Sequence, residues 1–443
     1  MKTLPILLAP LLLASCVTMN KVPWTPPPAL PAQAVPGTLL EGTDLERRSG
    51  PEAGQLLNLL SSWTLGLQIN TSMLAAEGLD AWRDSRLNNR VPVRAVRLRF
   101  VALTPQGEPD LQSGLLLLPT PSSGPTPLDW VIYDRGSELQ RATQPSRLAN
   151  DEIELGWLLA SLNHAVWMPD YGGVGDSPGQ QHYCLTPSLA ASSLDGLEAA
   201  RAWVKQNTGD TESGRLRVLG YSEGGLATMA TLKAWSENPA ATPGLTLTDA
   251  YPLGAPLNLT LGVENVASGK QVLTHPHYTL LLALGWARAY PDLVRPEEIF
   301  RPEIVQNIVP LLDGEHSREQ VQAAVTKLVG KPVGTVASAD VFRADYLQKL
   351  GTDPMSLPYY RLQQEARLDT WVAPTSVRVT LAASPADLLV SPENAKASLA
   401  AMLAADPRAP VRALTLASGT HALAGVEALV YAIMDVDRRT TAP

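Results

Sequence analysis

The sequence of 443 residues has only two cysteines, no run of lysines and arginines, and no internal repeat. Its formal net charge of −8 argues against a nucleic-acid partner, because a phosphate-binding surface needs an excess of basic residues. Beyond residue 13 no apolar stretch is long enough to span a membrane as a helix, and the leucine-rich stretch 280–284 is far too short. The apolar fraction of 45% is ample for a packed core, in one large domain or two ordinary ones.

The first residues have the pattern of an export signal. One positive charge, Lys2, precedes the apolar stretch 4–13, and Ala14-Ser15-Cys16 follows. Small residues before a cysteine resemble the lipobox of bacterial lipoproteins. We therefore expect residues 1–16 to be a lipoprotein signal peptide ending at Cys16, the lipidated first residue of the mature chain. Val17, in place of an aspartate, favours sorting to the outer membrane. The alternative is an ordinary signal peptide with a chance cysteine.

Residues 17–50 are expected to form a proline-rich tether. Six prolines lie between residues 23 and 36, and proline at this density favours a stiff, extended chain. A lipid anchor followed by a spacer predicts an exported protein of the bacterial cell envelope, attached to a membrane at its N-terminus. With Cys16 acylated, Cys184 has no partner for an intramolecular disulfide, so the fold depends on its core.

The most informative motif is the run GYSEGG at residues 220–225. It follows a short apolar run, 216–219, and precedes a helix-like stretch, 226–235, which places G-x-S-x-G in a strand–turn–helix context. In such a turn the serine hydroxyl projects from a strained backbone, and the flanking glycines let neighbouring segments approach closely. The helix N-terminus then directs its N–H groups toward an oxygen that will carry negative charge. This context makes Ser222 a candidate nucleophile.

Strand and helix patterns alternate on both sides of this motif. Strands are predicted at 95–103, 114–119, 129–133, 165–169, 246–254, 376–382 and 411–416, and helices at 152–162, 188–206 and 424–437. Such alternation predicts a mostly parallel sheet with helices on both faces. Between 256 and 371 only helical patterns occur. We therefore expect a core formed by residues 51–255 and 372–443, with residues 256–371 as an inserted helical cap.

A serine hydroxyl is a poor nucleophile and needs a base, usually a histidine that a carboxylate orients. Asp387 and His421 each lie in a loop directly after a predicted strand, and they follow Ser222 in the order Ser, Asp, His. Because ligands bind at the carboxyl ends of parallel strands, both loops should lie at the sheet edge that holds Ser222. Alternatively, Asp387 is only a turn former and His421 an ordinary loop residue.

Acyl transfer also needs N–H donors for the negatively charged oxygen of the tetrahedral intermediate, the oxyanion hole. One donor should be the backbone N–H of Glu223, the residue after the candidate nucleophile. The second is expected from the backbone N–H of Gly136 or Ser137, in the loop after strand 129–133, with the Ser137 hydroxyl as reinforcement. Arg135 in the same loop is expected to form a structural ion pair with Asp134 or Asp170.

The remaining histidines and Cys184 are weaker candidates. His275 and His277 form a pair, but no cysteine or carboxylate cluster completes a metal site, so no metal is expected. His182 follows a glycine-rich segment and is a minor candidate for lining a substrate pocket. Cys184 has no convincing base and is expected to be a small core residue.

Three segments resemble the secretory lipase family of α/β-hydrolases, the group related to fungal lipase A. They are WMPDYGGVG at 167–175, LDGLEAAR at 194–201 and GYSEGG at 220–225. The resemblance implies an α/β-hydrolase fold, a cap that shapes an acyl pocket, and a structural role for Asp170. Two positions depart from the family pattern. Glu223 stands where the family usually has glutamine, and Arg135-Gly136-Ser137 stands where relatives tend to have His-Gly-Thr.

Together these residues predict a serine ester hydrolase, a carboxylesterase or lipase, that acts on an acyl-ester or lipid substrate. Ser222, Asp387 and His421 would work through an acyl-enzyme intermediate, without a cofactor or a metal. Two alternatives stay open: a serine peptidase or amidase with the same three residues, and a catalytically inactive surface scaffold. The preferred chain length and the oligomeric state are not determined by the sequence.

Overall fold

The computed structural model describes residues 22–31, 33–58, 72–124, 127–268, 272–332 and 334–441. The expected signal peptide, residues 1–16 with Cys16, lies outside these ranges. Within them, no helix is both long and apolar enough to cross a membrane.

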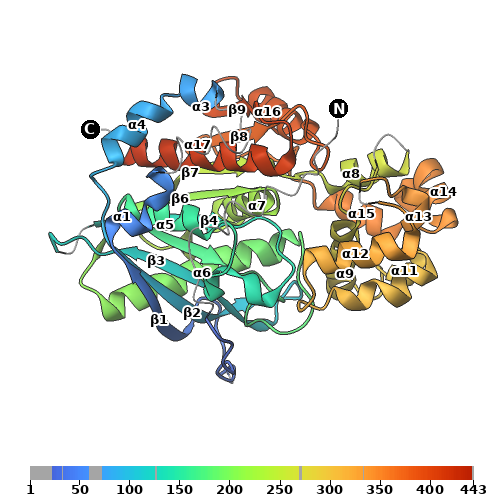
Figure 1. Ribbon diagram of the computed structural model, residues 1–443, viewed down its shortest axis with the longest axis horizontal. Coiled ribbons are helices and arrows are strands. Elements are labelled where there is room, and N and C mark those ends of the chain that lie inside the picture. Colours follow the sequence, from blue (N-terminus) through green and yellow to red (C-terminus); the bar gives the residue numbers. More distant parts are fainter. Residues whose placement is uncertain are drawn as a thin grey trace, which may run out of the picture.

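A nine-stranded sheet, with the strand order β1-β2-β3-β5-β4-β6-β7-β8-β9, runs through the described residues (Figure 1). β1, β2 and β3 pair antiparallel, β3 pairs antiparallel with β5, and all pairs from β5 to β9 are parallel. The strands are β1 (Leu39–Arg48), β2 (Val93–Leu103), β3 (Pro109–Pro119), β4 (Pro127–Asp134), β5 (His164–Pro169), β6 (Thr211–Tyr221), β7 (Thr246–Leu253), β8 (Arg378–Ala383) and β9 (Val411–Thr415). The predicted mostly parallel sheet is confirmed.

Burial on both faces explains the composition of the central strands. β4 is buried over residues 128–134 and β6 over 216–221, so neither strand alternates between apolar and polar residues. β2 differs, because its apolar residues alternate with Arg97 and Arg99, whose side chains are also buried. Arg99 donates hydrogen bonds to the backbone oxygen of Thr25, at 2.6 Å, and to Glu41, at 2.9 Å.

That contact corrects the expected tether over residues 17–50. Leu39–Arg48 is strand β1 of the sheet, paired with β2, and Val22 N donates to the Arg147 backbone oxygen at 3.2 Å. The described chain before β1 therefore contacts the core at Val22 and Thr25. The strand was missed because an edge strand faces solvent and needs no apolar alternation, and LLEGTDLERR is rich in charged residues.

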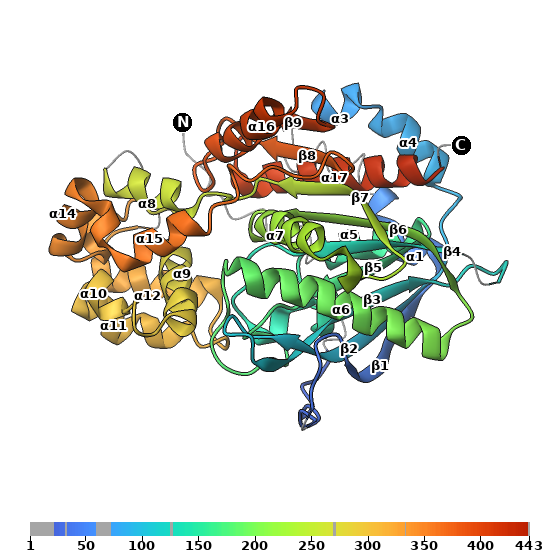
Figure 2. The ribbon, with the colours of Figure 1, turned by 180° about the vertical axis from the view of Figure 1, so that it is seen from behind.

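Helices cover both faces of the sheet (Figure 2). One apolar cluster joins the sheet to α6 (Thr186–Asn207), α7 (Glu223–Glu237) and α16 (Glu393–Ala405). A second cluster, on the opposite face, includes residues of α1 (Gly50–Ala53), α3 (Ser72–Ala76), α4 (Leu79–Arg86), α5 (Ile153–Ser161) and α17 (His421–Thr441). Each cluster buries the apolar side chains of one face.

Between β7 and β8 the described chain is mostly helical and gathers at one end of the molecule, where Figure 1 shows it beside the sheet. We call these helices the cap. They are α8 (Leu259–Ala267), α9 (Pro276–Ala289), α10 (Pro296–Ile299), α11 (Pro302–Asn307), α12 (Arg318–Val329), α13 (Ser338–Val341), α14 (Ala344–Thr352) and α15 (Pro358–Glu365). Two isolated β-bridges, Leu273 with Val336 and Phe300 with Phe342, tie the cap segments together. Its apolar residues belong to the same cluster as α6 and α7.

Candidate active site

The turn between β6 and α7 holds Ser222 in a strained conformation. Its φ is 60° and its ψ −122°, values that only a residue held firmly by its surroundings adopts. Its backbone N–H donates to the Leu253 oxygen at 3.0 Å, at the end of the neighbouring β7. A Cβ atom at Gly220 or Gly224 would collide with the Asp134 backbone oxygen at the end of β4. The two glycines therefore let β4 and the turn approach, which explains the G-x-S-x-G spacing.

The structure brings Ser222, His421 and Asp387 into one hydrogen-bonded row. The distance from Ser222 Oγ to His421 Nε2 is 2.9 Å, and that from His421 Nδ1 to Asp387 Oδ2 is 2.6 Å. The other carboxylate oxygen, Asp387 Oδ1, accepts from the N–H groups of Leu389 and Val390 at 2.8 and 3.0 Å. With the aspartate fixed in this way, Nδ1 carries the imidazole proton and Nε2 faces the serine as an acceptor.

Two side chains that the sequence did not single out hold the histidine loop. Tyr221 Oη donates to the backbone oxygen of His421 at 2.9 Å, and its ring lies 4.9 Å from the imidazole ring. Glu427, fully buried on α17, accepts from the N–H groups of Ala417 and Ser418. Tyr221 is adjacent to the serine in the sequence, which could have marked it, whereas Glu427 lies in no recognisable motif.

The loop after β4 corrects one of the expected oxyanion donors. The Gly136 N–H donates to Glu152 Oε1 at 2.9 Å, so it is already engaged. Ser137 lines the same cavity as Ser222, and its Oγ lies 2.8 Å from Tyr183 Oη. The Glu223 backbone N–H lies at the start of α7, directly after Ser222. The Gly136 N–H is therefore not available as an oxyanion donor, and the backbone N–H groups of Glu223 and Ser137 are the expected donors that remain.

Arg135 also differs from its expected pairing. Its fully buried guanidinium donates to the backbone oxygens of Gly136 and Asp170 at 2.8 and 2.6 Å and stacks on the ring of Tyr171. Its carboxylate partner is Glu223, at 3.5 Å, and not Asp134 or the side chain of Asp170. Asp170 itself accepts from Ser113 Oγ and from the N–H of Ser146. These bonds brace the loop after β5, in agreement with a structural role.

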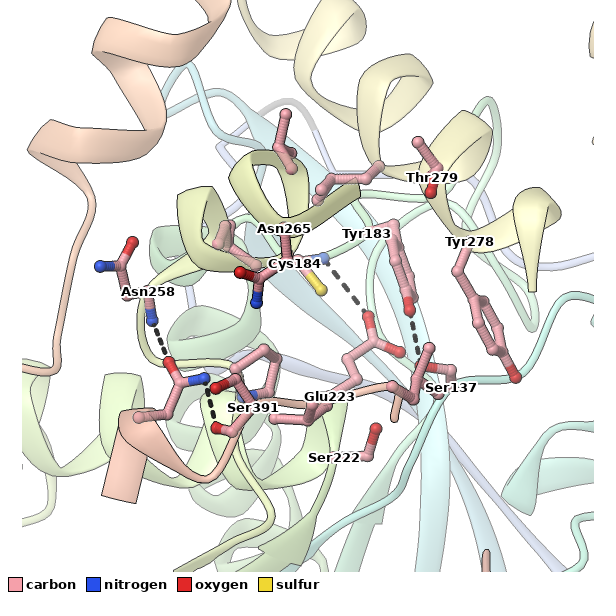
Figure 3. Close-up of a pocket in the computed structure, with 18 of the residues that line it drawn as sticks. Ser137, Tyr183, Cys184, Ser222, Glu223, Asn258, Asn265, Tyr278, Thr279 and Ser391 are labelled. Atoms are coloured by element: carbon pink, nitrogen blue, oxygen red, sulfur yellow. Dashed lines mark hydrogen bonds between the residues drawn. The ribbon is translucent and has the colours of Figure 1, made fainter. Parts of the chain in front are cut away.

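A cavity opens directly above Ser222, between the sheet edge and the cap (Figure 3). The core contributes Ser137, Tyr183 and Cys184 to its lining. The cap contributes mainly apolar and aromatic side chains, which include Leu259, Leu273, Tyr278, Leu282, Phe342 and Tyr359. The rings of Tyr183 and Tyr278 stack at 6.0 Å between centroids. The cavity is thus an apolar chamber that begins at the serine hydroxyl.

The side chain of Glu223 is an exception in this chamber. It is 1% exposed yet lines the cavity, and Figure 3 shows its carboxyl group above Ser222, directed toward Cys184. Oε1 accepts from the Cys184 N–H at a long 3.4 Å. Burial raises the pKa of Glu223 to about 7, although Arg135 acts to lower it. Burial likewise raises the pKa of Asp134 and of Glu152 to about 7, so three carboxyl groups with raised pKa values surround the buried Arg135.

The weaker candidates take no part in the hydrogen-bonded row of Ser222, His421 and Asp387. His182 is buried with Nδ1 at 2.7 Å from Ser188 Oγ and is not among the residues that line the cavity. Cys184 is buried and free, and burial raises its pKa well above the usual value for a thiol. His275 and His277 lie beside Tyr278 with ring centroids 5.8 Å apart, and in the described part of the chain no group of three or more His, Cys, Asp or Glu could hold a metal ion.

No protein-family model matches the chain, and no curated protein matches it in sequence. Several solved structures do resemble it. The rice cell wall degrading esterase LipA from Xanthomonas oryzae is 19% identical with a TM-score of 0.73, over 92% of this chain and 98% of that one. A putative hydrolase from Legionella pneumophila is 20% identical with a TM-score of 0.70, over 90% and 97% of the two chains. Candida antarctica lipase A in its closed state is 14% identical with a TM-score of 0.55, over 88% and 78%.

At these identities the similarity establishes the fold and not the reaction. The mostly parallel sheet, the helices on both faces and these structural matches together show that the chain has the α/β-hydrolase fold.

Proposed function

We propose that this protein is a serine ester hydrolase with Ser222 as its nucleophile. The observation that carries the proposal is the hydrogen-bonded row of Ser222, His421 and Asp387 at the floor of an apolar cavity. Two of the structures that share the fold are named as an esterase and as a lipase, which supports the same class of reaction.

The first half of the reaction is acylation. Ser222 Oγ attacks the ester carbonyl carbon while His421 Nε2 takes the hydroxyl proton, and Asp387 stabilises the resulting imidazolium through its bond to Nδ1. The carbonyl oxygen becomes an oxyanion, which the backbone N–H of Glu223 and that of Ser137 would bind. The dipole of α7 adds a positive potential at the same place.

Acylation ends when the tetrahedral intermediate collapses, His421 gives its proton to the departing alcohol, and the acyl group stays on Ser222. In deacylation, water attacks the acyl carbon while His421 takes one of its protons. The second tetrahedral intermediate then collapses, the bond to Ser222 Oγ breaks, His421 returns the proton to that oxygen, and the acid leaves. Every proton moves through His421 Nε2, so a single base serves both halves. The apolar walls from the cap suit the acyl group, whose transfer from water into the cavity contributes to binding.

The test is the hydrolysis of p-nitrophenyl esters from acetate to palmitate by the wild type and by His421→Ala. We expect kcat/KM to fall by roughly 10⁴-fold or more in the variant, because the serine loses its base. His316→Ala is the matched control, since His316 is a half-exposed cap residue that contacts Asp313. Equal rates for His421→Ala and the wild type would exclude the proposal.

Two further measurements separate the alternatives. A peptidase or amidase would cleave aminoacyl anilides in preference to the esters. An inactive scaffold would not react with a fluorophosphonate probe, whereas we expect Ser222 to be labelled and Ser222→Ala not to be. The chain-length optimum of the ester series then distinguishes an esterase from a lipase.

We also propose that Cys16 is lipidated and anchors the chain to a bacterial membrane, the outer membrane in view of Val17. The support is the sequence Leu13-Ala14-Ser15-Cys16 after an apolar stretch. Cys16→Ala should move the protein out of the membrane fraction and abolish the incorporation of labelled palmitate. Unchanged fractionation and labelling in Cys16→Ala would rule the anchor out.

A further inference from the structure

Glu223 brings a buried carboxyl group to the apolar cavity. The residue is 1% exposed, and two of its contacts are long: 3.4 Å from Oε1 to the Cys184 N–H and 3.5 Å from Oε2 to Arg135 Nη1. The Ser137 hydroxyl also hydrogen-bonds to this carboxyl group. A buried carboxyl group normally makes several shorter hydrogen bonds, because leaving its oxygens poorly bonded costs free energy. Its oxygens therefore keep acceptor capacity directed into the cavity, above Ser222 (Figure 3).

The groups around Glu223 determine which partner suits it. The loop after β4 presents Arg135 and Ser137, the segment before α6 presents Tyr183 and Cys184, and α9 presents Tyr278. Arg135 is the one charged group among these five neighbours, and it is a cation. An ammonium group bound at Glu223 would be repelled by it, whereas a neutral hydroxyl would not. The carboxyl group accepts a hydrogen bond whether or not it carries a proton.

The position of Glu223 next to the nucleophile determines where on a substrate such a hydroxyl must lie. The backbone N–H of this residue is a proposed oxyanion donor, so the residue that would bind the ester carbonyl also presents the carboxyl group to the adjoining part of the cavity. A plain alkyl chain in that place would cover the carboxyl group without offering it a hydrogen bond, which is unfavourable.

From this geometry we infer that the acyl group of the preferred substrate carries a hydroxyl close to the scissile carbonyl, and that the Glu223 carboxyl group binds it. The substrate class is a hydroxyacyl ester. The inference rests on the proposed ester hydrolysis and adds the polar group that the apolar walls alone would not predict.

The test compares p-nitrophenyl 3-hydroxybutyrate with p-nitrophenyl butyrate, which differ by the hydroxyl alone. For the wild type we expect kcat/KM to be about tenfold higher for the hydroxy ester, the discrimination of one good hydrogen bond to a carboxyl group. In Glu223→Met, whose side chain has a similar length and no acceptor oxygen, the ratio should fall to about one. In Glu223→Gln, which keeps an acceptor oxygen, most of the preference should remain.

Glu152→Gln is the matched control, because Glu152 belongs to the same buried group of carboxyls but binds the Gly136 N–H and does not line the cavity. A merely structural effect of losing a buried carboxyl group would lower kcat/KM for both esters together. The ratio of the two kcat/KM values therefore separates binding of the hydroxyl from a structural effect. We expect Glu152→Gln to keep the wild-type ratio.

A wild-type ratio of one or less overturns the inference, and this measurement needs no variant to fold. So does a full preference that persists in Glu223→Met, or a wild-type preference for p-nitrophenyl 3-aminobutyrate over the hydroxy ester. If the wild type hydrolyses neither butyrate nor hydroxybutyrate, it is the proposed function that fails.

Discussion

The sheet core and the cap contribute different things to the same cavity. The core supplies the three residues in the hydrogen-bonded row, each of which comes shortly after the end of a parallel strand. The cap supplies walls, which include Leu282 on α9 and Phe342 beside α13. The comparison suggests that the core encodes the rate of the reaction and, through Glu223, the preference for a hydroxyl, whereas the cap encodes the fit of the acyl chain.

The two regions also differ in how tightly their backbones are packed. At Gly220, Gly224 and Gly225 of the serine turn, an added Cβ would meet backbone atoms of β4, α7 or β7. At Gly351 of the cap helix α14, it would meet nothing within 4 Å. The turn is thus held by close contacts of main chain with main chain, whereas parts of the cap have space for a larger side chain. Four predictions test the contrast between the core and the cap.

The largest effect is expected from the core residue Asp387. Asp387→Asn should lower kcat by roughly 10³–10⁴-fold, because an amide can donate to His421 Nδ1 and so favour the wrong tautomer. The p-nitrophenyl ester assay measures this, with the unfolding midpoint as a control for folding. A loss below tenfold would mean that Asp387 only shapes its turn.

A glycine pair compares the two regions directly. Gly224→Ala should destabilise the protein by about 3 kcal/mol, because the new methyl group collides with the Asp134 backbone oxygen. Gly351→Ala should stabilise it by about 0.5–1 kcal/mol, since alanine favours a helix. Urea unfolding at constant slope gives both values. Equal changes in the free energy of unfolding for the two variants would contradict a difference in packing between the two regions.

The buried carboxyl groups of the core predict a dependence of stability on pH. Burial raises the pKa of Asp134 from 3.8 to about 7, against the lowering effect of its bonds from Ser193 and Thr228. The Asp134 carboxyl group therefore binds its proton more tightly in the folded state than in the unfolded state. The stability that this group contributes is complete below about pH 4 and is lost as the pH rises through 7.

Asp134→Asn removes that titration while it keeps the shape of the side chain. Between pH 4.5 and 7.5 the wild type should lose about 3 kcal/mol more unfolding free energy than the variant does. Chemical denaturation at the two pH values measures the difference. Equal losses would show that Asp134 is ionised at the lower pH in the folded protein.

The smallest effect is expected in the cap. Leu282→Ala enlarges the cavity, so kcat/KM for short acyl esters should fall by roughly fivefold and the chain-length optimum should move to longer esters. Leu293→Ala, at a cap leucine that is 45% exposed, is the matched control and should leave the optimum unchanged. An unchanged optimum in Leu282→Ala would place the acyl group outside this cavity.

Much of the fold could be predicted because its signals are local. The central strands are short apolar runs and the helices have clear apolar periodicity, so their order along the chain predicted the mostly parallel sheet. Strand β1 was missed because it is a charged edge strand, and its pairing with β2 is a contact between segments about fifty residues apart.

The sequence by itself determined the strained turn at Ser222 and the chain order of Ser222, Asp387 and His421. Glycine spacing and a strand before a helix act within a few residues, and parallel strands bring their carboxyl ends to one edge. Only the tertiary structure decided that Glu152 occupies the Gly136 N–H, that Arg135 faces Glu223, and that the cap leaves the Glu223 carboxyl group in an apolar cavity. These outcomes depend on burial and on contacts between segments distant in sequence, and no local pattern records them.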